Sequence, residues 1–86
     1  PWSLVSRWLR RHRQVRVVNL YSQTETAGTV CARLVDAAPA DASGSVPIGH
    51  PLGGARVHLL DETLAPVPDG EAGEICVAGD RLAAGY

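Results

Sequence analysis

Lysine, methionine and phenylalanine are absent from this sequence, and cysteine occurs only twice in its 86 residues. Because every basic side chain is arginine, a reaction step that needs a lysine ammonium must draw it from elsewhere. No apolar run approaches the roughly 18–20 residues that a membrane-spanning helix requires. The Arg-rich first residues also lack the apolar core of a secretory signal. We therefore expect a cytoplasmic protein with no membrane partner.

Cysteine and histidine are too few and too dispersed to indicate a metal cluster. Cys31 and Cys76 lie far apart, each in a β-type run, which fits neither zinc-ligand spacing nor a disulfide framework. We expect both thiols to be buried and to pack as small apolar side chains. His58 alternates with apolar neighbours, which predicts a position on the outer face of a strand.

The charge is unevenly distributed, although the net charge is only −1. Five of the eight arginines fall in the first 16 residues, while three arginines against nine acids leave −6 for the rest. This balance gives no general attraction to nucleic acid. A basic helix can contact an acidic partner, as a small protein-interaction module would, or it can be the solvated face of an amphipathic helix. Both interpretations remain open at this point.

The first third of the chain predicts one helix and two strands. Apolar residues recur at helical spacing and predict a helix over residues 3–13, with Ser3 as its N-cap. The run "VRVVNLY" predicts a buried strand of β-branched residues. The polar stretch "SQTETAG" predicts a turn, after which "TVCARLV" predicts the next strand.

The remaining sequence predicts an exposed connection and an antiparallel pair. Residues 36–47 are rich in Ala, Pro, Ser and Gly without any period, which is typical of an exposed loop. The runs "ARVHLLD" and "EICVAG" flank a turn-rich segment and predict two paired strands. The expected fold class is mixed α/β: a helix, a buried strand, then mainly antiparallel strands.

Polar side chains gather where the first predicted strand ends. Asn19 and Tyr21 have the chemistry to bond and stack a nucleotide base, Thr24 can bind a phosphate oxygen, and Glu25 can hold Mg²⁺. Ligands of α/β folds commonly bind at the carboxyl ends of strands. The alternative interpretation is structural, because Thr24 and Glu25 are also residues that cap turns.

Two stretches resemble the sequence motifs of one family. "NLYSQTET" resembles the N-x-Y-G-P-T-E motif of the adenylate-forming enzymes, which include nonribosomal peptide synthetase adenylation domains, acyl-CoA synthetases and luciferases. "VPIGHPLGGARVHLLDETLAPVPDGEAGEICVAGDRLAAGY" resembles the family's P-I-G-R-P block, its hairpin and its G-E-L-x-I-x-G-x-G-L-A-R-G-Y block. The match covers essentially residues 1–86. It implies a partial AMP-binding domain, an internal fragment of the large N-terminal subdomain.

The resemblance implies a role for each matching residue. Asn19 would bond the adenine edge, Tyr21 would stack on the ring, Thr24 would bind the α-phosphate, and Glu25 would hold Mg²⁺. Thr24 and Glu25 are therefore the implied catalytic residues. The positions that line the acyl pocket in the family correspond to Leu20, Gly28 and Thr29.

The implied reaction is ATP-dependent activation of a carboxylate as an acyl-adenylate. The sequence of the hairpin segment, "LDETLAPVPDGEAGEI", most resembles that of peptide synthetases. This resemblance implies an amino acid substrate and transfer to the phosphopantetheine of a carrier domain. Two departures blur this assignment, because Ser22 replaces the usual Gly and Gln23 the usual Pro. Gln at the second position is frequent in acyl-CoA synthetases, so an acyl- or aryl-CoA synthetase remains the alternative.

The chain contains only part of what the reaction needs. The family's glycine-rich phosphate loop, the aspartate that holds the ribose and the adenylation lysine have no counterpart in these residues. We therefore expect a segment of a larger enzyme that is inactive alone and has the remainder of the adenylation domain as its partner.

Overall fold

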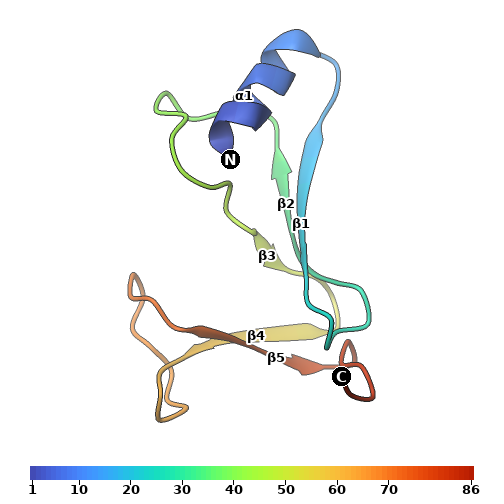
Figure 1. The fold of residues 1–86 in the computed structure, drawn as a ribbon, viewed down its shortest axis with the longest axis vertical. Helices are drawn as coiled ribbons and strands as arrows, with labels where there is room; N and C mark the ends of the chain where they lie inside the picture. Colours follow the sequence, from blue (N-terminus) through green and yellow to red (C-terminus); the bar gives the residue numbers. More distant parts are fainter. The chain divides into compact units, whose positions relative to one another are not determined.

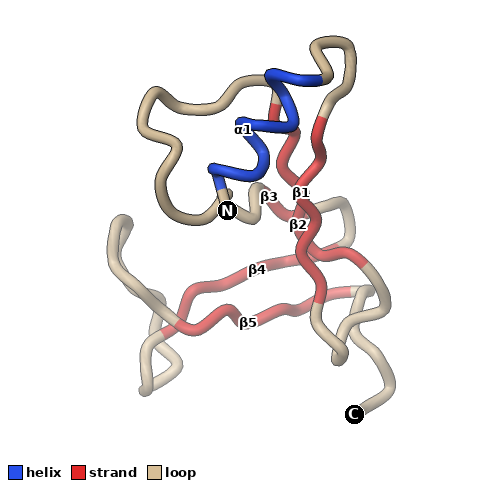
Figure 2. Tube along the Cα trace, turned by 45° about the horizontal axis from the view of Figure 1, so that its top comes forward, coloured by secondary structure: helices blue, strands red, loops and turns tan.

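The computed structural model describes all 86 residues. The chain divides into two compact units: Pro1–Tyr21 with Cys31–His50, and Ser22–Val30 with Pro51–Tyr86. We call these the first unit and the second unit, and each is described by itself. One helix precedes five strands in the order α1, β1, β2, β3, β4 and β5 (Figures 1 and 2). The predicted mixed α/β composition is confirmed at this level.

The helix α1, Trp2–Arg11, buries one face and exposes the other. Trp2 and Ser6 are buried and lie one turn apart, so they share a face of the helix. Arg10 and Arg11 occupy the last turn, where cations interact favourably with the negative end of the helix dipole. This helix of ten residues is too short and too polar to span a bilayer.

The predicted start of this helix is wrong. The structure begins the helix at Trp2 and places Pro1 at the N-cap, without a side-chain cap, so Ser3 already lies inside the first turn. The carbonyl of Pro1 accepts the first helical hydrogen bonds, from the amides of Leu4 (3.2 Å) and Val5 (3.4 Å). A further backbone contact, from the amide of Trp2 to the carbonyl of Gly44 (3.0 Å), fixes the helix start in place of a serine cap.

Three strands form the first sheet, in the order β1–β2–β3, with bounds Val17–Ser22, Thr29–Val35 and His50–Pro51. The central strand β2 contains the most deeply buried residues, because it has a neighbour on both edges. Val30, Cys31 and Val35 are each at most 2% exposed. Burial raises the pKa of the Cys31 thiol, so the neutral form is favoured, as expected of an apolar core residue.

The prediction that the first strand is buried is wrong. Along β1, half-buried and exposed residues alternate at every position, and Val18 and Leu20 are 51% and 59% exposed. This strand lies at the edge of its sheet, and one of its faces is not covered by other residues of the structure. The apolar residues of this run, which predicted full burial, therefore lie on two different faces of the strand, and only one of these faces is partly covered.

The second unit is built around an antiparallel pair, β4 (Ala55–Leu60) and β5 (Glu74–Gly79). The register runs from Ala55 opposite Gly79 to Leu60 opposite Glu74, and Figure 1 shows the two strands side by side. Both predicted strands are thus confirmed. His58 is exposed, as its alternation with apolar neighbours predicted. Its partner Cys76 is only half-buried, so the expected full burial holds for Cys31 alone.

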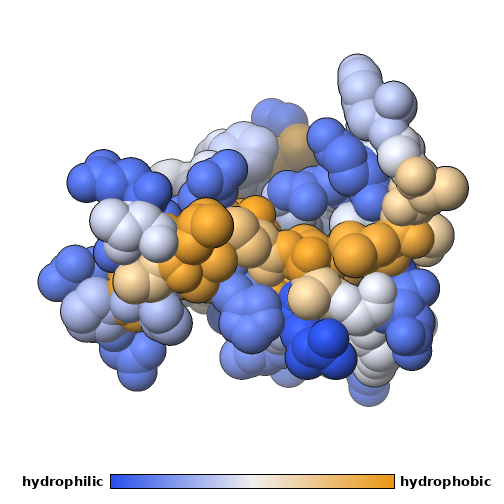
Figure 3. All heavy atoms as spheres, turned by 90° about the horizontal axis from the view of Figure 1, so that it is seen from below, coloured by the Kyte–Doolittle hydropathy of each residue, from blue (hydrophilic) through white to orange (hydrophobic).

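Apolar side chains reach the surface in many places. Figure 3 shows apolar and hydrophilic residues side by side on one face of the molecule. The largest exposed apolar side chains are Leu4, Trp8, Val15, Val18, Leu20, Leu34, Leu59, Leu64, Leu82 and Tyr86. A chain of this length is expected to bury only about 60–65% of its unfolded surface, and a small core follows from that geometry.

Candidate nucleotide-binding turn

The residues implied by the resemblance are divided between the two units. Asn19, Leu20 and Tyr21 belong to the first unit and are carried by β1. The turn residues Thr24 and Glu25 belong to the second unit. The structure therefore defines two local arrangements, one on a strand and one on a turn.

The strand arrangement separates base-binding from pocket-lining positions. Asn19 and Tyr21 are two residues apart and share the half-buried face of β1. Leu20 lies between them and is on the opposite, exposed face. The two implied functions of this strand, binding of the base and lining of the acyl pocket, thus fall on different faces.

Asn19 connects its strand to the loop that follows β2. Its Nδ2 amide donates hydrogen bonds to the carbonyl of Pro47 at 2.8 Å and to the carbonyl of Val46 at 3.3 Å. Because carbonyl oxygens only accept, the amide nitrogen has to face them. The side-chain oxygen Oδ1 is the group of Asn19 left for a ligand. This tether could not be inferred from the sequence, since residues 46 and 47 carry no signal for it.

The turn that follows β1, residues 22–28, is closed by one threonine, and we call it the motif turn. Thr26 is 7% exposed, and its Oγ1 accepts a hydrogen bond from the amide of Gln23 (3.2 Å). The same oxygen lies 2.8 Å from the carbonyl of Gln23 and 3.1 Å from that of Gly28, either of which can accept its single proton. Thr26 therefore satisfies several backbone groups of the turn at once.

Thr24 and Glu25 take no part in closing the motif turn. Both residues are exposed, and neither side chain has a hydrogen bond or an ion pair in the structure. The alternative interpretation, in which these two side chains cap the turn, is therefore wrong, because Thr26 performs that function. The sequence "TET" contains two threonines, and only their hydrogen bonds distinguish the structural one from the free one.

Residues 81–83 bond the backbone of the motif turn. The amide of Ala27 donates to the carbonyl of Arg81 (2.7 Å), and the amide of Ala83 donates to the carbonyl of Glu25 (2.8 Å). Thr26 and Leu82 face each other in the resulting antiparallel bridge. Two stretches more than 50 residues apart in the sequence, at 25–27 and 81–83, are thus joined through their backbones.

Sequence reasoning missed the contribution of Arg81. Its Nε donates to the carbonyl of Gly53 (3.0 Å), and its Nη1 donates to the carbonyl of Thr29 (3.3 Å). One side chain thereby connects residue 81 to the start of β2 and to the segment before β4. Charge alone gave no signal for this role, because a guanidinium that binds carbonyls is indistinguishable in the sequence from a solvated one.

Gly28 and Thr29 end the motif turn. Gly28 has a φ of 102°, in the region that favours glycine, and a Cβ added there would meet no atom within 4 Å. Glycine is therefore required by the backbone conformation and not by a lack of space. Thr29 is half-buried and uses its carbonyl for Arg81, so only its side chain is left for other contacts.

Acidic side chains near the motif turn are few. No group of three or more His, Cys, Asp or Glu side chains is positioned to hold a metal ion. A single free carboxylate, that of Glu25, extends from the motif turn. Mg²⁺ is commonly held by one or two carboxylates together with substrate phosphates and water, so this donor fits Mg²⁺ that arrives with a nucleotide.

A second polar turn follows β4 at residues 61–65, and we call it the hairpin turn. In contrast to Thr24 and Glu25, one of its acidic side chains and its hydroxyl side chain form hydrogen bonds within the turn. Oδ1 of Asp61 accepts hydrogen bonds from Oγ1 (2.6 Å) and N (2.8 Å) of Thr63 and from N of Ala65 (3.0 Å). The hydroxyl of Thr63, followed by these two amides, lowers the pKa of the Asp61 carboxyl. The carboxylate of Asp61 thus bonds two backbone amides of the turn, and the hydroxyl of Thr63 bonds that carboxylate.

Comparison with known proteins decides the family. A family model described as "AMP-binding enzyme" matches residues 1–86. The chain belongs to the AMP-binding enzyme family. The resemblance inferred from the two motifs is thereby confirmed.

Several members of the AMP-binding family are close in sequence. Gramicidin S synthase 1 of Brevibacillus brevis is 40% identical over 84 residues, which is 98% of this chain and 7% of that protein. The isonitrile lipopeptide synthase of Mycobacterium tuberculosis is 42% identical over 86 residues, 100% of this chain and 3% of that protein. A probable non-canonical nonribosomal peptide synthetase of Salinispora arenicola is 45% identical over 83 residues, 96% of this chain and 1% of that protein. The chain thus spans a small part of each of these AMP-binding relatives.

Proposed function

We propose that this chain forms part of the active site of an enzyme that activates an amino acid with ATP. The observation that carries the proposal is the motif turn. Its backbone is fixed by Thr26 and by residues 81–83, while Thr24 and Glu25 extend free side chains. A fixed backbone that presents unengaged polar groups is the arrangement expected of a ligand-binding loop.

In the proposed reaction, a carboxylate oxygen of the amino acid attacks the α-phosphorus of ATP. The bond from this phosphorus to the oxygen bridging to the β-phosphate breaks, giving an aminoacyl-adenylate and pyrophosphate. The acyl group then passes to the phosphopantetheine thiol of a carrier domain, and AMP is released. Catalysis of this kind depends on positioning and on stabilisation of negative charge.

The motif turn supplies two groups for this chemistry. The hydroxyl of Thr24 donates a hydrogen bond to an α-phosphate oxygen, and the carboxylate of Glu25 binds Mg²⁺. When bound, Mg²⁺ neutralises part of the charge on the phosphates. Neither side chain has to break an existing hydrogen bond before it binds, because both are free in the structure.

The half-buried face of β1 supplies the groups for adenine. Tyr21 stacks on the ring, and Oδ1 of Asn19 accepts a hydrogen bond from the exocyclic amino group. The Nδ2 donors of Asn19 are used by Val46 and Pro47, which leaves Oδ1 as its acceptor. An acceptor at this position favours adenine, whose 6-position is a donor, over guanine, whose 6-position is an acceptor.

This chain supplies only a small part of the proposed acyl pocket. Leu20 contributes an exposed apolar side chain, Gly28 leaves open space beside the turn, and Thr29 adds a half-buried side chain. The amino acid that is activated depends on further residues of the enzyme. A cytoplasmic location, where ATP is available, belongs to the same proposal.

The amino acid is favoured over a fatty or aryl acid by the kind of relatives that match. Two relatives are named as a gramicidin S synthase and a nonribosomal peptide synthetase, and both cover nearly the whole chain. The partners that follow are the remainder of the adenylation domain and a carrier domain. An acyl- or aryl-CoA synthetase is the alternative, and transfer of the activated acid to free coenzyme A would distinguish it.

Exchange of labelled pyrophosphate into ATP tests the proposal in the natural polypeptide that carries these residues. Across a panel of amino, fatty and aryl acids, we expect exchange that depends on one or a few amino acids. Glu25→Gln should lower this exchange by roughly 10²-fold and raise the Mg²⁺ concentration needed for half-maximal rate.

The matched control is Glu62→Gln, which changes the same residue type in the hairpin turn. Glu62 is exposed, and its substitution should leave the exchange rate unchanged. An unchanged rate in Glu25→Gln, or exchange with no amino acid of the panel, would contradict the proposal. The isolated 86 residues are expected to show no exchange, because no lysine is present among them.

A further inference from the structure

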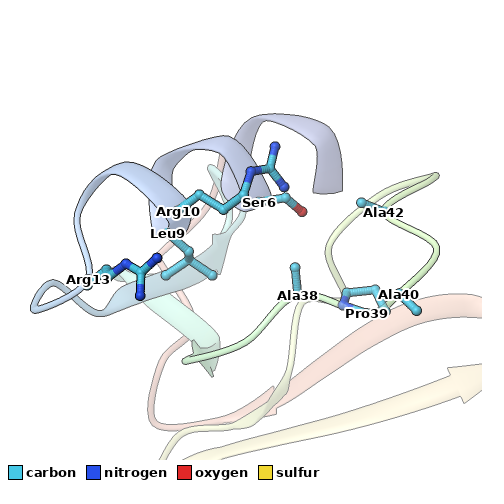
Figure 4. Close-up of a pocket in the computed structure, with 8 residues that line it drawn as sticks. All are labelled: Ser6, Leu9, Arg10, Arg13, Ala38, Pro39, Ala40 and Ala42. Atoms are coloured by element: carbon cyan, nitrogen blue, oxygen red, sulfur yellow. The ribbon is translucent and has the colours of Figure 1, made fainter.

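Arg81 differs from the other seven arginines of the chain, all of which are exposed. Arg10 and Arg13, for example, line an open hollow between α1 and residues 38–42 (Figure 4), and neither forms a hydrogen bond or an ion pair. Arg81 is half-buried, and its side chain donates two hydrogen bonds to backbone carbonyls. Because a long side chain loses rotamer freedom when it is held in this way, its position in the second unit is well defined.

Arg81 is bonded on both sides of Gly28, the residue at which the motif turn ends. Its carbonyl accepts from the amide of Ala27 (2.7 Å), and its Nη1 donates to the carbonyl of Thr29 (3.3 Å). Gly28 itself has a φ of 102° and open space around it, so its own contacts restrain it little. The two bonds from Arg81 therefore restrict the point at which the motif turn can pivot relative to the start of β2.

The other bond of the Arg81 side chain reaches a segment that is itself held. Nε donates to the carbonyl of Gly53 (3.0 Å). The preceding residue, Leu52, donates from its amide to the carbonyl of Val30 (2.8 Å), and Val30 is fully buried. The guanidinium thus connects the end of the motif turn to backbone that is anchored at a core residue. Charge-assisted hydrogen bonds of this kind are stronger than those between neutral groups.

We propose that Arg81 is a positioning residue for the motif turn, and that its guanidinium fixes where Thr24 and Glu25 meet the nucleotide and Mg²⁺. This inference rests on the proposed function, because it takes these two side chains as the groups that bind the α-phosphate and the metal. Arg81 bonds neither of them and acts through the backbone. Without its side chain the turn keeps the internal bonds of Thr26 but is no longer fixed to the start of β2. Reactions that depend on alignment are sensitive to small displacements of this kind.

Pyrophosphate exchange at varied Mg²⁺ concentration tests the proposal in the natural polypeptide, with the amino acid that gives the fastest exchange. Arg81→Gln should raise the Mg²⁺ concentration for half-maximal exchange about fivefold and lower the maximal rate roughly tenfold, because the carboxylate of Glu25 is displaced. A loss of folded enzyme alone would lower the rate and leave the Mg²⁺ requirement unchanged. Arg81→Lys keeps the charge but not the planar pair of donors, so it should raise the Mg²⁺ requirement only about twofold.

Arg56→Gln is the matched control for these variants. Arg56 is an exposed arginine of the same unit, and its side chain has no hydrogen bond or ion pair. Its substitution should leave both the maximal rate and the Mg²⁺ requirement unchanged.

Hydrogen exchange supplies a measurement that does not depend on activity. In Arg81→Gln the amide of Ala27 should exchange about threefold faster, because the segment that accepts from it is less firmly held. The amide of Gln23 bonds Thr26 within the turn and should be unaffected. Unchanged exchange at Ala27 would contradict the proposed role of Arg81.

The variants at Arg81 and Glu25 separate failure of this proposal from failure of the proposed function. An unchanged Mg²⁺ requirement in Arg81→Gln, while Glu25→Gln raises it, would overturn the positioning role alone. Should Arg81→Gln not fold, as judged by circular dichroism, the same result in Arg81→Lys would overturn it. An effect of Arg81→Gln on the Mg²⁺ requirement that persists in full in the Glu25→Gln background would also overturn it, since Arg81 would then act independently of Glu25. An unchanged requirement in Glu25→Gln would instead contradict the proposed function.

Discussion

The motif turn and the hairpin turn contain the same kinds of residues and use them differently. In the hairpin turn, the carboxylate of Asp61 accepts three hydrogen bonds, and the hydroxyl of Thr63 donates one of them. In the motif turn, a single threonine, Thr26, satisfies the backbone. The acid and the other threonine of that turn, Glu25 and Thr24, remain free.

This difference shows that polar composition alone does not identify a binding loop. A polar side chain that completes the hydrogen bonds of its own turn has little capacity left for a ligand. A side chain that is free in a turn already completed by other groups can bind a ligand without local rearrangement. The hydrogen bonds of each turn, and not its residue types, carry the functional information.

The largest expected effect is a difference in pyrophosphate exchange between variants of the motif turn and variants of the hairpin turn. Thr24→Val in the natural polypeptide should lower pyrophosphate exchange by roughly 10²-fold, because the donor that we propose for the α-phosphate is lost. The same substitution at Thr63 should leave exchange unchanged and should speed hydrogen exchange at the amide of Ala65. Equal effects of both substitutions on catalysis would remove the distinction between the turns.

The next effect concerns the threonine that closes the motif turn. Thr26→Val should lower the local free energy of opening by about 2 kcal/mol, since it removes the hydroxyl oxygen that accepts from the part-buried amide of Gln23 and one of the two donors to the Gln23 carbonyl. Hydrogen exchange at the amide of Gln23 measures this change. Thr24→Val should leave the same amide unaffected, and a comparable loss in that variant would contradict the assignment of roles.

A smaller effect is expected at Leu64 in the hairpin turn. This residue has a φ of 62°, which is unfavourable for a leucine, and its side chain is 70% exposed. Leu64→Gly should therefore stabilise the turn by about 0.5 kcal/mol, because relief of the backbone conformation exceeds the entropy that glycine loses. Leu59→Gly, in a strand with ordinary φ, should destabilise instead.

The smallest effect is a pH dependence of the hairpin turn. The pKa of Asp61 is lowered in the folded turn, so its contribution to stability is present above the ordinary aspartate pKa of about 4 and is lost as pH falls further. Hydrogen exchange at Thr63 and Ala65, corrected for the intrinsic pH dependence, should show weaker protection in acid. Asp61→Asn should abolish this pH dependence. An unchanged acid response in that variant would contradict the assignment.

The sequence predicted the elements of this fold better than their burial. Periodicity located α1 and the strands β4 and β5, because side-chain alternation and helical spacing are local properties. It failed for β1, which was expected to be buried and is half exposed. Burial depends on what covers a strand, and that information is distant in the chain. The start of α1 was missed for a similar reason, since its first amide is bonded to Gly44.

For the site, the sequence identified candidate residues but not their connections. The motif resemblance singled out Thr24 and Glu25, and the structure adds that both are free. Neither the tether from Asn19 to residues 46 and 47 nor the bonds from Arg81 to Gly53 could be inferred. Such contacts join side chains to backbone carbonyls, which every residue possesses, so the partner leaves no trace in the sequence.

Alternation along β1 gives this strand an evolutionary property. Leu20 projects away from the face that carries Asn19 and Tyr21, so under the proposed function a mutation at Leu20 would change the acyl pocket and leave the adenine contacts unchanged. A single-residue insertion in the strand would have the reverse outcome, because it would exchange the two faces and disrupt both recognition tasks together. If the proposed roles hold, substitutions within β1 should be tolerated better than changes in its length.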